Sequence, residues 1–223
     1  MTLKGISQRM KRLLSPDPDH FLRSVSAVIH VGANTGQERD HYEHLGLRVL
    51  WIEPIPEVFG ELTNNISKLP KQQAIQALVT DEDNKQYSFN IASNNGASSS
   101  ILELKDHKDI WPQVEFVETI SLRSKTLTSL LHEEGIDPSS FGALILDTQG
   151  SELLVLKGAV PILKHFSFIK TEVADFESYS GCCRLDDLNQ FMKMHGFRPY
   201  FRQAFATRKE GGTYYDVTYK REV

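Results

Sequence analysis

Short apolar runs alternate with helix-like segments along most of this 223-residue chain, which leaves few fold classes open to it. Runs of four to eight apolar residues are typical of buried strands, and longer segments of mixed polarity are typical of crossover helices. The strand-like runs are residues 27–31, 48–52, 74–79, 143–146 and 166–170. The helix-like segments are residues 35–45, 54–66, 126–132, 151–163 and 185–195. This order predicts an α/β fold built from βαβ units around a mostly parallel sheet.

Two regions depart from this alternation. Residues 87–91 and 114–120 alternate apolar and polar side chains, which is typical of short antiparallel strands, and the polar run 93–100 between them is expected to be a loop. Near the C-terminal end, residues 197–201 and 213–219 have strand character, and Gly211-Gly212 between them predicts a hairpin turn. We therefore expect about seven main strands and find no linker that would divide them.

The first 20 residues are predicted to form an amphipathic helix in front of one domain at residues 21–223. Apolar and basic side chains recur there at near-helical spacing: Leu3, Ile6, Met10, Leu13 and Leu14 with Lys4, Arg9, Lys11 and Arg12. Such a helix is expected to dock on the domain or on a second subunit, which allows a homodimer. Contact with a membrane surface is the alternative.

Composition restricts the compartment and the partners. No apolar run approaches the roughly 18 residues of a membrane span, so no transmembrane segment is expected. The N-terminus lacks the apolar stretch of a secretory signal, and the only cysteines, Cys182 and Cys183, are adjacent, which favours a reducing, cytoplasmic location. A net charge of −4 argues against a nucleic-acid partner.

The most informative segment is His30-Val31-Gly32-Ala33-Asn34-Thr35-Gly36, between the first strand and the first helix. Glycines at such a turn let the backbone bend sharply and approach a ligand, and N–H groups at the helix start would face that ligand. Glu53 ends the second strand about 20 residues later, where a carboxylate can accept hydrogen bonds from both hydroxyls of a ribose. Because ligands of open parallel sheets bind at the carboxyl ends of the strands, the two features predict one nucleoside site.

The spacing of the glycines distinguishes two kinds of nucleotide. The pattern is G-x-x-x-G rather than G-x-G-x-x-G, so the cradle for a pyrophosphate lacks one glycine. A nicotinamide oxidoreductase is therefore the less favoured interpretation, and a nucleoside without a pyrophosphate fits better. A purely structural turn explains the glycines alone but not their combination with Glu53.

Four segments resemble the FkbM-type S-adenosylmethionine-dependent methyltransferases, over about residues 28–201. They are residues 31–36, the Ile52-Glu53-Pro54 segment with Phe59 and Leu62, residues 96–99, and residues 144–159. The last segment carries Asp147-Thr148-Gln149-Gly150-Ser151-Glu152, which is similar to the Asp-x-Glu-Gly-x-Glu core of that family. Gln149 stands where the family has its first Glu, and His30 stands where the family usually has Asp.

The resemblance implies a class I methyltransferase, or Rossmann-like, fold: a seven-stranded, mostly parallel sheet of order 3-2-1-4-5-7-6 with helices on both faces and an antiparallel C-terminal hairpin. It implies S-adenosyl-L-methionine as the cofactor. It also implies O-methylation of a hydroxyl on a carbohydrate, a glycan precursor or another secondary metabolite. Two alternatives stay open: methylation of a protein or other nitrogen acceptor, and a non-catalytic S-adenosylmethionine-binding module, which the residues at positions 30 and 149 allow.

Candidates for cofactor binding come from the first two strand ends, the polar loop and the family core. They are His30, Gly32, Ala33, Asn34, Gly36, Glu53, Pro54, Ser98, Ser99, Asp147 and Gln149. The alternative for His30 is packing against the sheet, and the alternative for the two serines is an ordinary surface loop.

Three carboxylates are candidates for binding the acceptor or removing its proton. Asp147 ends the fourth strand and could contact the methionine end or the acceptor hydroxyl, or cap the following helix. Glu152 lies in the first turn of that helix and could be a base or only complement the helix dipole. Glu172 ends the fifth strand and could bind the acceptor or act as the base.

No metal site is predicted. His41 and His44 lie three residues apart on the first helix but lack an evident third ligand, so a solvated helix face explains them better. A magnesium ion held by Asp147 with Glu172 or Asp175 is the weaker alternative.

Overall fold

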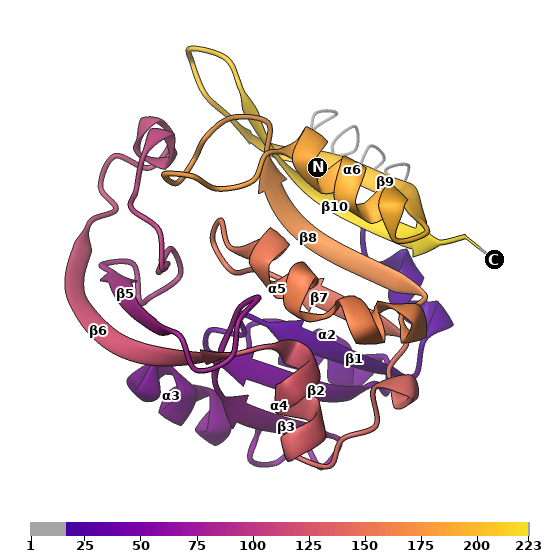
Figure 1. Cartoon of the computed structure of the whole chain (residues 1–223). Helices are drawn as coiled ribbons and strands as arrows, with labels where there is room; N and C mark the ends of the chain where they lie inside the picture. The colour runs from indigo at the N-terminus through magenta and orange to yellow at the C-terminus, as the bar shows by residue number, and fades with distance from the viewer. Residues whose placement is uncertain (1–16, 223) are drawn as a thin grey trace, which may run out of the picture.

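Seven strands form the main sheet of the computed structural model, which describes residues 17–222 (Figure 1). They are β1 (Ala27–Val31), β2 (Arg48–Glu53), β3 (Gln72–Gln76), β7 (Ala143–Leu146), β8 (Phe168–Ala174), β9 (Phe197–Thr207) and β10 (Thr213–Arg221). Their spatial order is β3-β2-β1-β7-β8-β10-β9. The first five pair in parallel, and β10 is antiparallel to both of its neighbours. The order 3-2-1-4-5-7-6 and the C-terminal hairpin are thereby confirmed.

Helices cover both faces of the main sheet. One face, in front in Figure 1, carries α4 (Leu127–Glu133), α5 (Glu152–Gly158), the 3-10 helix η4 (Val160–His165) and α6 (Leu185–Met194). The other face carries the 3-10 helix η1 (His20–Ser24), α2 (Arg39–His44) and α3 (Pro56–Ile66). Two short 3-10 helices, η2 (Asp106–Asp109) and η3 (Pro138–Ser140), lie in connections.

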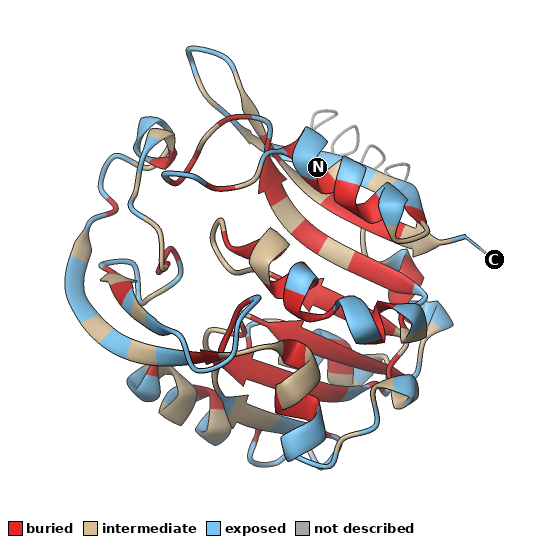
Figure 2. Ribbon diagram, in the orientation of Figure 1, coloured by how far each residue is buried: buried red, intermediate tan, exposed pale blue. Residues whose placement is uncertain are grey.

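The two faces of the sheet belong to two hydrophobic cores. In β1, Ile29 and Val31 pack into the core on the α4–α5–α6 side, whereas Val28 packs into the core on the α2–α3 side. Every residue of β1 and β7 is buried, as Figure 2 shows. Burial on both faces explains why these strands are nearly continuous apolar runs in the sequence.

A second sheet of order β4-β6-β5 stands beside the main one. It consists of β4 (Leu78–Val79), β5 (Gln86–Ala92) and β6 (Phe116–Lys125). β5 and β6 are antiparallel, which confirms the prediction from their alternating pattern. The outer surface of β6 is largely exposed (Figure 2).

The prediction of one strand over residues 74–79 is wrong, because the chain changes sheets within it. Gln76 pairs with Glu53 in the main sheet, whereas Leu78 pairs with Ser124 of β6 in the second sheet. Leu78 is buried against Ile55 and Phe89. An apolar run continues through the crossing, so the sequence pattern does not show the change of sheet.

Two predicted helices are shorter than their sequence patterns suggested. The segment 35–45 begins as a turn, since Gly36 has a φ of +72°, and α2 starts only at Arg39. The segment 151–163 is divided into α5 and η4, because Pro161 has no N–H group to continue an α-helix. Of the predicted N-terminal helix, residues 1–16 lie outside the described residues.

Candidate functional site

The turn after β1 brings the ends of β1, β2 and β7 together. Gly32 has a φ of +82°, and the N–H groups of Gly32 and Ala33 donate to the Ile52 carbonyl at 3.0 and 3.1 Å. A Cβ atom on Gly32 would lie 1.8 Å from the carbonyl oxygen of Asp147. Only glycine therefore allows the turn to approach the end of β7 this closely.

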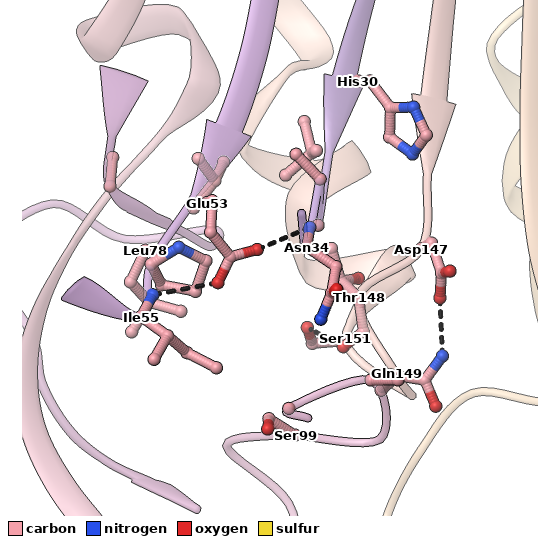
Figure 3. Close-up of a pocket in the computed structure, with 18 of the residues that line it drawn as sticks. His30, Asn34, Glu53, Ile55, Leu78, Ser99, Asp147, Thr148, Gln149 and Ser151 are labelled. Atoms are coloured by element: carbon pink, nitrogen blue, oxygen red, sulfur yellow. Dashed lines mark hydrogen bonds between the residues drawn. The ribbon is translucent and has the colours of Figure 1, made fainter. Parts of the chain in front are cut away.

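Glu53 connects that turn to the end of β2. Its Oε2 accepts a hydrogen bond from the Asn34 N–H at 2.8 Å, and its Oε1 accepts one from the Ile55 N–H at 2.9 Å (Figure 3). Glu53 is 3% exposed, and burial raises the pKa of its carboxyl to about 7. The expected meeting of the first turn and the second strand's carboxylate is thereby confirmed.

A cavity with an empty volume of about 840 Å³, including its open mouth, lies over these strand ends. Ile55, Leu78 and Phe89 form an apolar wall of this cavity. An apolar wall next to a carboxylate suits a flat ring joined to a sugar with free hydroxyls.

Most of the predicted cofactor-binding residues line this cavity. They are His30, Gly32, Ala33, Asn34, Glu53, Pro54, Ser99, Asp147 and Gln149. Gly36 does not line it, and its turn packs on α3, where an added Cβ would lie 2.8 Å from Leu62 Cδ1. Ser98 does not line it either, because its side chain bonds with Asn94 and His107.

His30 packs against the sheet, as its alternative expected, and also lines the cavity, while its part in cofactor binding stays a prediction. Its ring is stacked on Trp51 with 5.0 Å between ring centroids, and the Tyr42 hydroxyl lies 3.2 Å from its Nδ1. Burial, with Lys170 nearby, lowers the pKa of His30 to about 3. The imidazole is therefore neutral and can accept a hydrogen bond but supplies no charge.

Asp147 and Gln149 form the opposite end of the cavity from the apolar wall. Gln149 has a φ of +52°, and its Nε2 donates to Asp147 Oδ1 at 2.5 Å (Figure 3). Burial and the nearby Glu152 carboxyl raise the pKa of Asp147 above its ordinary value. The alternative of helix capping by Asp147 is wrong, since the residue at the N-cap of α5 is Ser151.

The other two candidate carboxylates face a smaller neighbouring pocket. Glu152 accepts hydrogen bonds from the N–H groups of Thr148 at 2.9 Å and Gly150 at 3.1 Å, so it stabilises the loop after β7. Glu172 is half-buried on β8, and burial, with Asp147 nearby, raises its pKa well above the ordinary value. Only Asp147 of the three lines the large cavity.

Several cavity residues were missed by the sequence analysis. They are Val31, Gln37, Glu38, Ile55, Ala77, Leu78, Val79, Phe89, Gly96, Ala97, Thr148 and Ser151. Ile55 follows a strand end directly, so its position in the sequence could have identified it. Phe89 gave no such signal, because it reaches the cavity only through the pairing of β5 with β6. Among the described residues, the buried hydroxyl of Thr148 has no hydrogen-bond partner.

Residues 17–222 show no feature typical of a metal site or a membrane span. No group there of three or more His, Cys, Asp or Glu side chains could hold a metal ion. The carboxylate of Asp175, a candidate magnesium ligand, accepts instead from the Thr213 N–H at 2.7 Å. Within the same range, no helix has the length and hydropathy needed to cross a bilayer.

A family model described as the methyltransferase FkbM domain matches residues 30–199. A search of curated proteins found no match. Among solved structures, the chain is similar to the METTL16 methyltransferase domain, with a TM-score of 0.52 and 9% identity over 88% of this chain and 60% of that one. It is also similar to Sp1610 of Streptococcus pneumoniae, with a TM-score of 0.51 and 9% identity over 93% of this chain and 71% of that one.

The TrmK protein of M. capricolum, solved with its cofactor product S-adenosylhomocysteine, has a TM-score of 0.52 and 7% identity. The match covers 88% of this chain and 62% of that one, so this chain spans about three fifths of both TrmK and the METTL16 domain. At these identities the likeness shows the fold that the chains share.

Proposed function

This chain belongs to the FkbM family of S-adenosylmethionine-dependent methyltransferases, and we propose that it methylates a hydroxyl oxygen of a carbohydrate, a glycan precursor or another secondary metabolite. S-adenosylmethionine supplies a methyl group that is bound to a positively charged sulfur. Transfer of the methyl group leaves the sulfur as a neutral thioether. The protein therefore has to hold the cofactor, align the acceptor oxygen, exclude water and accept one proton.

The observation that carries this proposal is the contact between Glu53 and the turn after β1. The carboxylate lies 2.8 Å from the Asn34 N–H and keeps lone pairs for the two ribose hydroxyls of a nucleoside. Ile55, Leu78 and Phe89 would hold the adenine ring against the apolar wall. Thr148 lines the other end of the cavity with Asp147 and Gln149, next to the place left for the methionine part.

The charge of the cavity also fits this cofactor. Its lining includes the carboxyl groups of Glu38, Glu53 and Asp147, and among the described residues no lysine or arginine lines it. Such a lining suits a cationic sulfonium and a cationic amino group. It does not suit the pyrophosphate of a nicotinamide dinucleotide, which the glycine spacing had already made the less favoured ligand.

Asp147 is the candidate base for the acceptor's proton. It lines the cavity, and its raised pKa makes it a stronger proton acceptor than an exposed aspartate. Glu172 is the second candidate, from the neighbouring pocket on β8. Glu152 is less suited, because its carboxylate already accepts from two backbone N–H groups of its own loop.

A turnover assay with a methyl-labelled donor and a panel of neutral glycans, sugars and hydroxylated metabolites tests the proposal. Mass spectrometry of the product identifies the methylated atom. We expect Asp147→Asn to weaken cofactor binding, because one of the three cavity carboxyls is lost, and to lower kcat at saturating cofactor by about 10²–10⁴-fold. Asp137→Asn, at an exposed cap of η3, is the matched control and keeps wild-type kcat.

Each contrary outcome has a definite meaning. Methylation of nitrogen only would overturn the O-methyl assignment while keeping the methyltransferase activity. Binding of S-adenosylmethionine in calorimetry without transfer to any acceptor would instead favour the non-catalytic module.

A further inference from the structure

Four groups form a hydrogen-bonded chain from the end of β7 to the loop at residues 93–100. The Gln149 Nε2 donates to Asp147 Oδ1 at 2.5 Å, and the Tyr179 hydroxyl donates to Gln149 Oε1 at 2.8 Å. The same hydroxyl lies 3.3 Å from the Ser98 carbonyl oxygen. Tyr179 is 1% exposed, so water does not compete for these contacts.

The loop at residues 93–100 is part of the cavity wall. Its residues Gly96, Ala97 and Ser99 line the cavity. On one side the Asn34 Nδ2 donates to the Asn95 carbonyl at 3.1 Å, and on the other the Ser100 hydroxyl donates to the Gln149 carbonyl at 2.8 Å. The loop is therefore attached both to the turn after β1 and to the segment that carries Asp147.

The proton state of Asp147 determines the direction of each bond in this chain. An ionised carboxylate can only accept, so the Gln149 amide must turn its NH₂ group toward Asp147. Its carbonyl oxygen then faces Tyr179, which must donate its single proton there. The Ser98 carbonyl receives little of that proton, in agreement with its longer distance of 3.3 Å.

A protonated Asp147 reverses the chain. The carboxylic acid can donate to the Gln149 oxygen, so the amide turns over and directs its NH₂ group at the Tyr179 oxygen. The Tyr179 proton is then free for the Ser98 carbonyl. The Tyr179 hydroxyl then makes two hydrogen bonds, one from the Gln149 NH₂ group and one to the Ser98 carbonyl, whereas it makes one when Asp147 is ionised. The bond to Ser98 holds the loop.

From this geometry we propose that Tyr179, acting through the Gln149 amide, is a positioning residue that couples the proton state of Asp147 to the attachment of the loop at residues 93–100. The proposal rests on the proposed function, in which Asp147 takes the acceptor's proton. In that step the acceptor oxygen takes the methyl group as the donor's carbon–sulfur bond breaks with its electron pair on sulfur, the acceptor O–H bond breaks, and an O–H bond forms on Asp147. The loop is then held more firmly at Ser98 until the proton leaves.

The test is a carboxyl titration by NMR, with ¹³C-labelled aspartate and Asp147→Asn to assign the signal. Tyr179→Phe removes one hydrogen bond from the ionised arrangement and two from the protonated one. The protonated form therefore loses more, and the pKa of Asp147 falls by about 0.5–1, as expected for one buried hydrogen bond between neutral groups. Gln149→Glu has the opposite effect, because two adjacent carboxyls share one proton and the pKa rises.

Tyr219→Phe is the matched control. It removes the hydroxyl of a similarly buried tyrosine, which donates to Asn189 at 2.8 Å and packs in the core on the α4–α5–α6 side, and it leaves the Asp147 titration unchanged. Circular dichroism checks that each variant folds. If Tyr179→Phe does not fold, the proposal is tested in the wild-type protein, where the backbone amide signal of Ser99, which follows the Ser98 carbonyl, must shift together with the Asp147 titration. An Asp147 titration that stays at its wild-type position in either folded variant, or moves in the other direction, overturns the proposal.

The titration needs no acceptor and no turnover. Failure to find O-methylation would therefore count against the proposed function and leave this measurement valid.

Discussion

At the scale of single residues, Gly32 and Gly135 make a matched pair. Both have a positive φ, of +82° and +64°, but only Gly32 has an atom where a Cβ would go, the Asp147 carbonyl oxygen at 1.8 Å. We expect Gly135→Ala to lower the free energy of unfolding by about 1–2 kcal/mol, the cost of a left-handed backbone for alanine. Gly32→Ala should lower it by about 3 kcal/mol or more, because β1 and β7 must also move apart.

Urea denaturation of both variants measures this difference. Equal losses would mean that the turn after β1 can relax away from β7 without cost. The close approach would then be no requirement of the site.

The second residue-scale prediction concerns Glu53. Burial raises the pKa of its carboxyl to about 7, so the group is ionised above that pH and protonated below it. Ribose hydroxyls donate to the ionised form, whereas the protonated form has lost an acceptor position. Affinity for S-adenosylhomocysteine should therefore be constant above about pH 8 and fall as the pH is lowered through 7, by at most about tenfold for each further unit, until the weaker affinity of the protonated form is reached.

Calorimetry between pH 5.5 and 8.5 measures that profile. Glu53→Gln should bind weakly and without this pH dependence, since it cannot ionise and must turn an NH₂ group toward the N–H of Asn34 or Ile55. The same pH slope in Glu53→Gln would assign the effect to another group.

At the scale of elements, the sequence predicts the strands of the main sheet well, because burial on both faces makes them continuous apolar runs. The same property hides the place where the chain leaves that sheet. Gln76 and Leu78 belong to different sheets, yet the apolar pattern runs through both. The predicted helices were too long for a different reason. The positive φ at Gly36 delays the start of one helix and Pro161 ends another, although the apolar pattern continues past both residues.

Some residues of the site could be predicted from the sequence, and others could not. The rule that ligands bind at strand ends identifies Glu53 and Asp147 from the sequence, and both line the cavity. It cannot identify Phe89, which comes from the second sheet through long-range pairing. It also does not distinguish Ser98 from Ser99, since the fold of their loop decides which hydroxyl faces the cavity.

The apolar wall from β4 gives an element-scale prediction. Leu78 is 6% exposed and lines the cavity, whereas Leu130 on α4 is 2% exposed and does not. Either change to alanine should cost about 2–4 kcal/mol of stability through the space left behind. Only Leu78→Ala should also weaken binding of S-adenosylhomocysteine, by about tenfold, because the adenine ring loses part of its contact surface.

Denaturation and calorimetry on the same two variants separate the effects. Equal binding losses would show that affinity follows general stability. In that case β4 would have no specific part in the cavity.

At the scale of the whole molecule, charge restricts the acceptor. The chain has a net charge of −4, and Asp147, Glu172 and Asp216 lie near one another at the carboxyl ends of β7 and β8. The nearby cation, Lys170, is already bonded to Asp19 at 2.8 Å and lies 4.0 Å from Asp216. An acceptor with phosphate groups would therefore enter a region of negative potential.

The resulting prediction compares a neutral sugar acceptor with a form that carries a phosphate at another position. The same hydroxyl is methylated in both. We expect kcat/KM to be at least about tenfold lower for the phosphorylated form at low salt, and the gap to narrow as salt is added, because exposed charges are screened. The gap should also widen between pH 6 and 8.5. Asp147, whose pKa is raised by burial to about 7, gains its charge over this range, and the phosphate has its second ionisation near pH 6.

Glu172→Gln serves as the control for the source of this discrimination, since it removes one of the charges while keeping the shape of the side chain. It should reduce the gap at pH values where Glu172 is ionised. A phosphorylated acceptor that is preferred at all pH values would contradict the charge argument. The acceptor's anionic group would then bind away from these carboxylates.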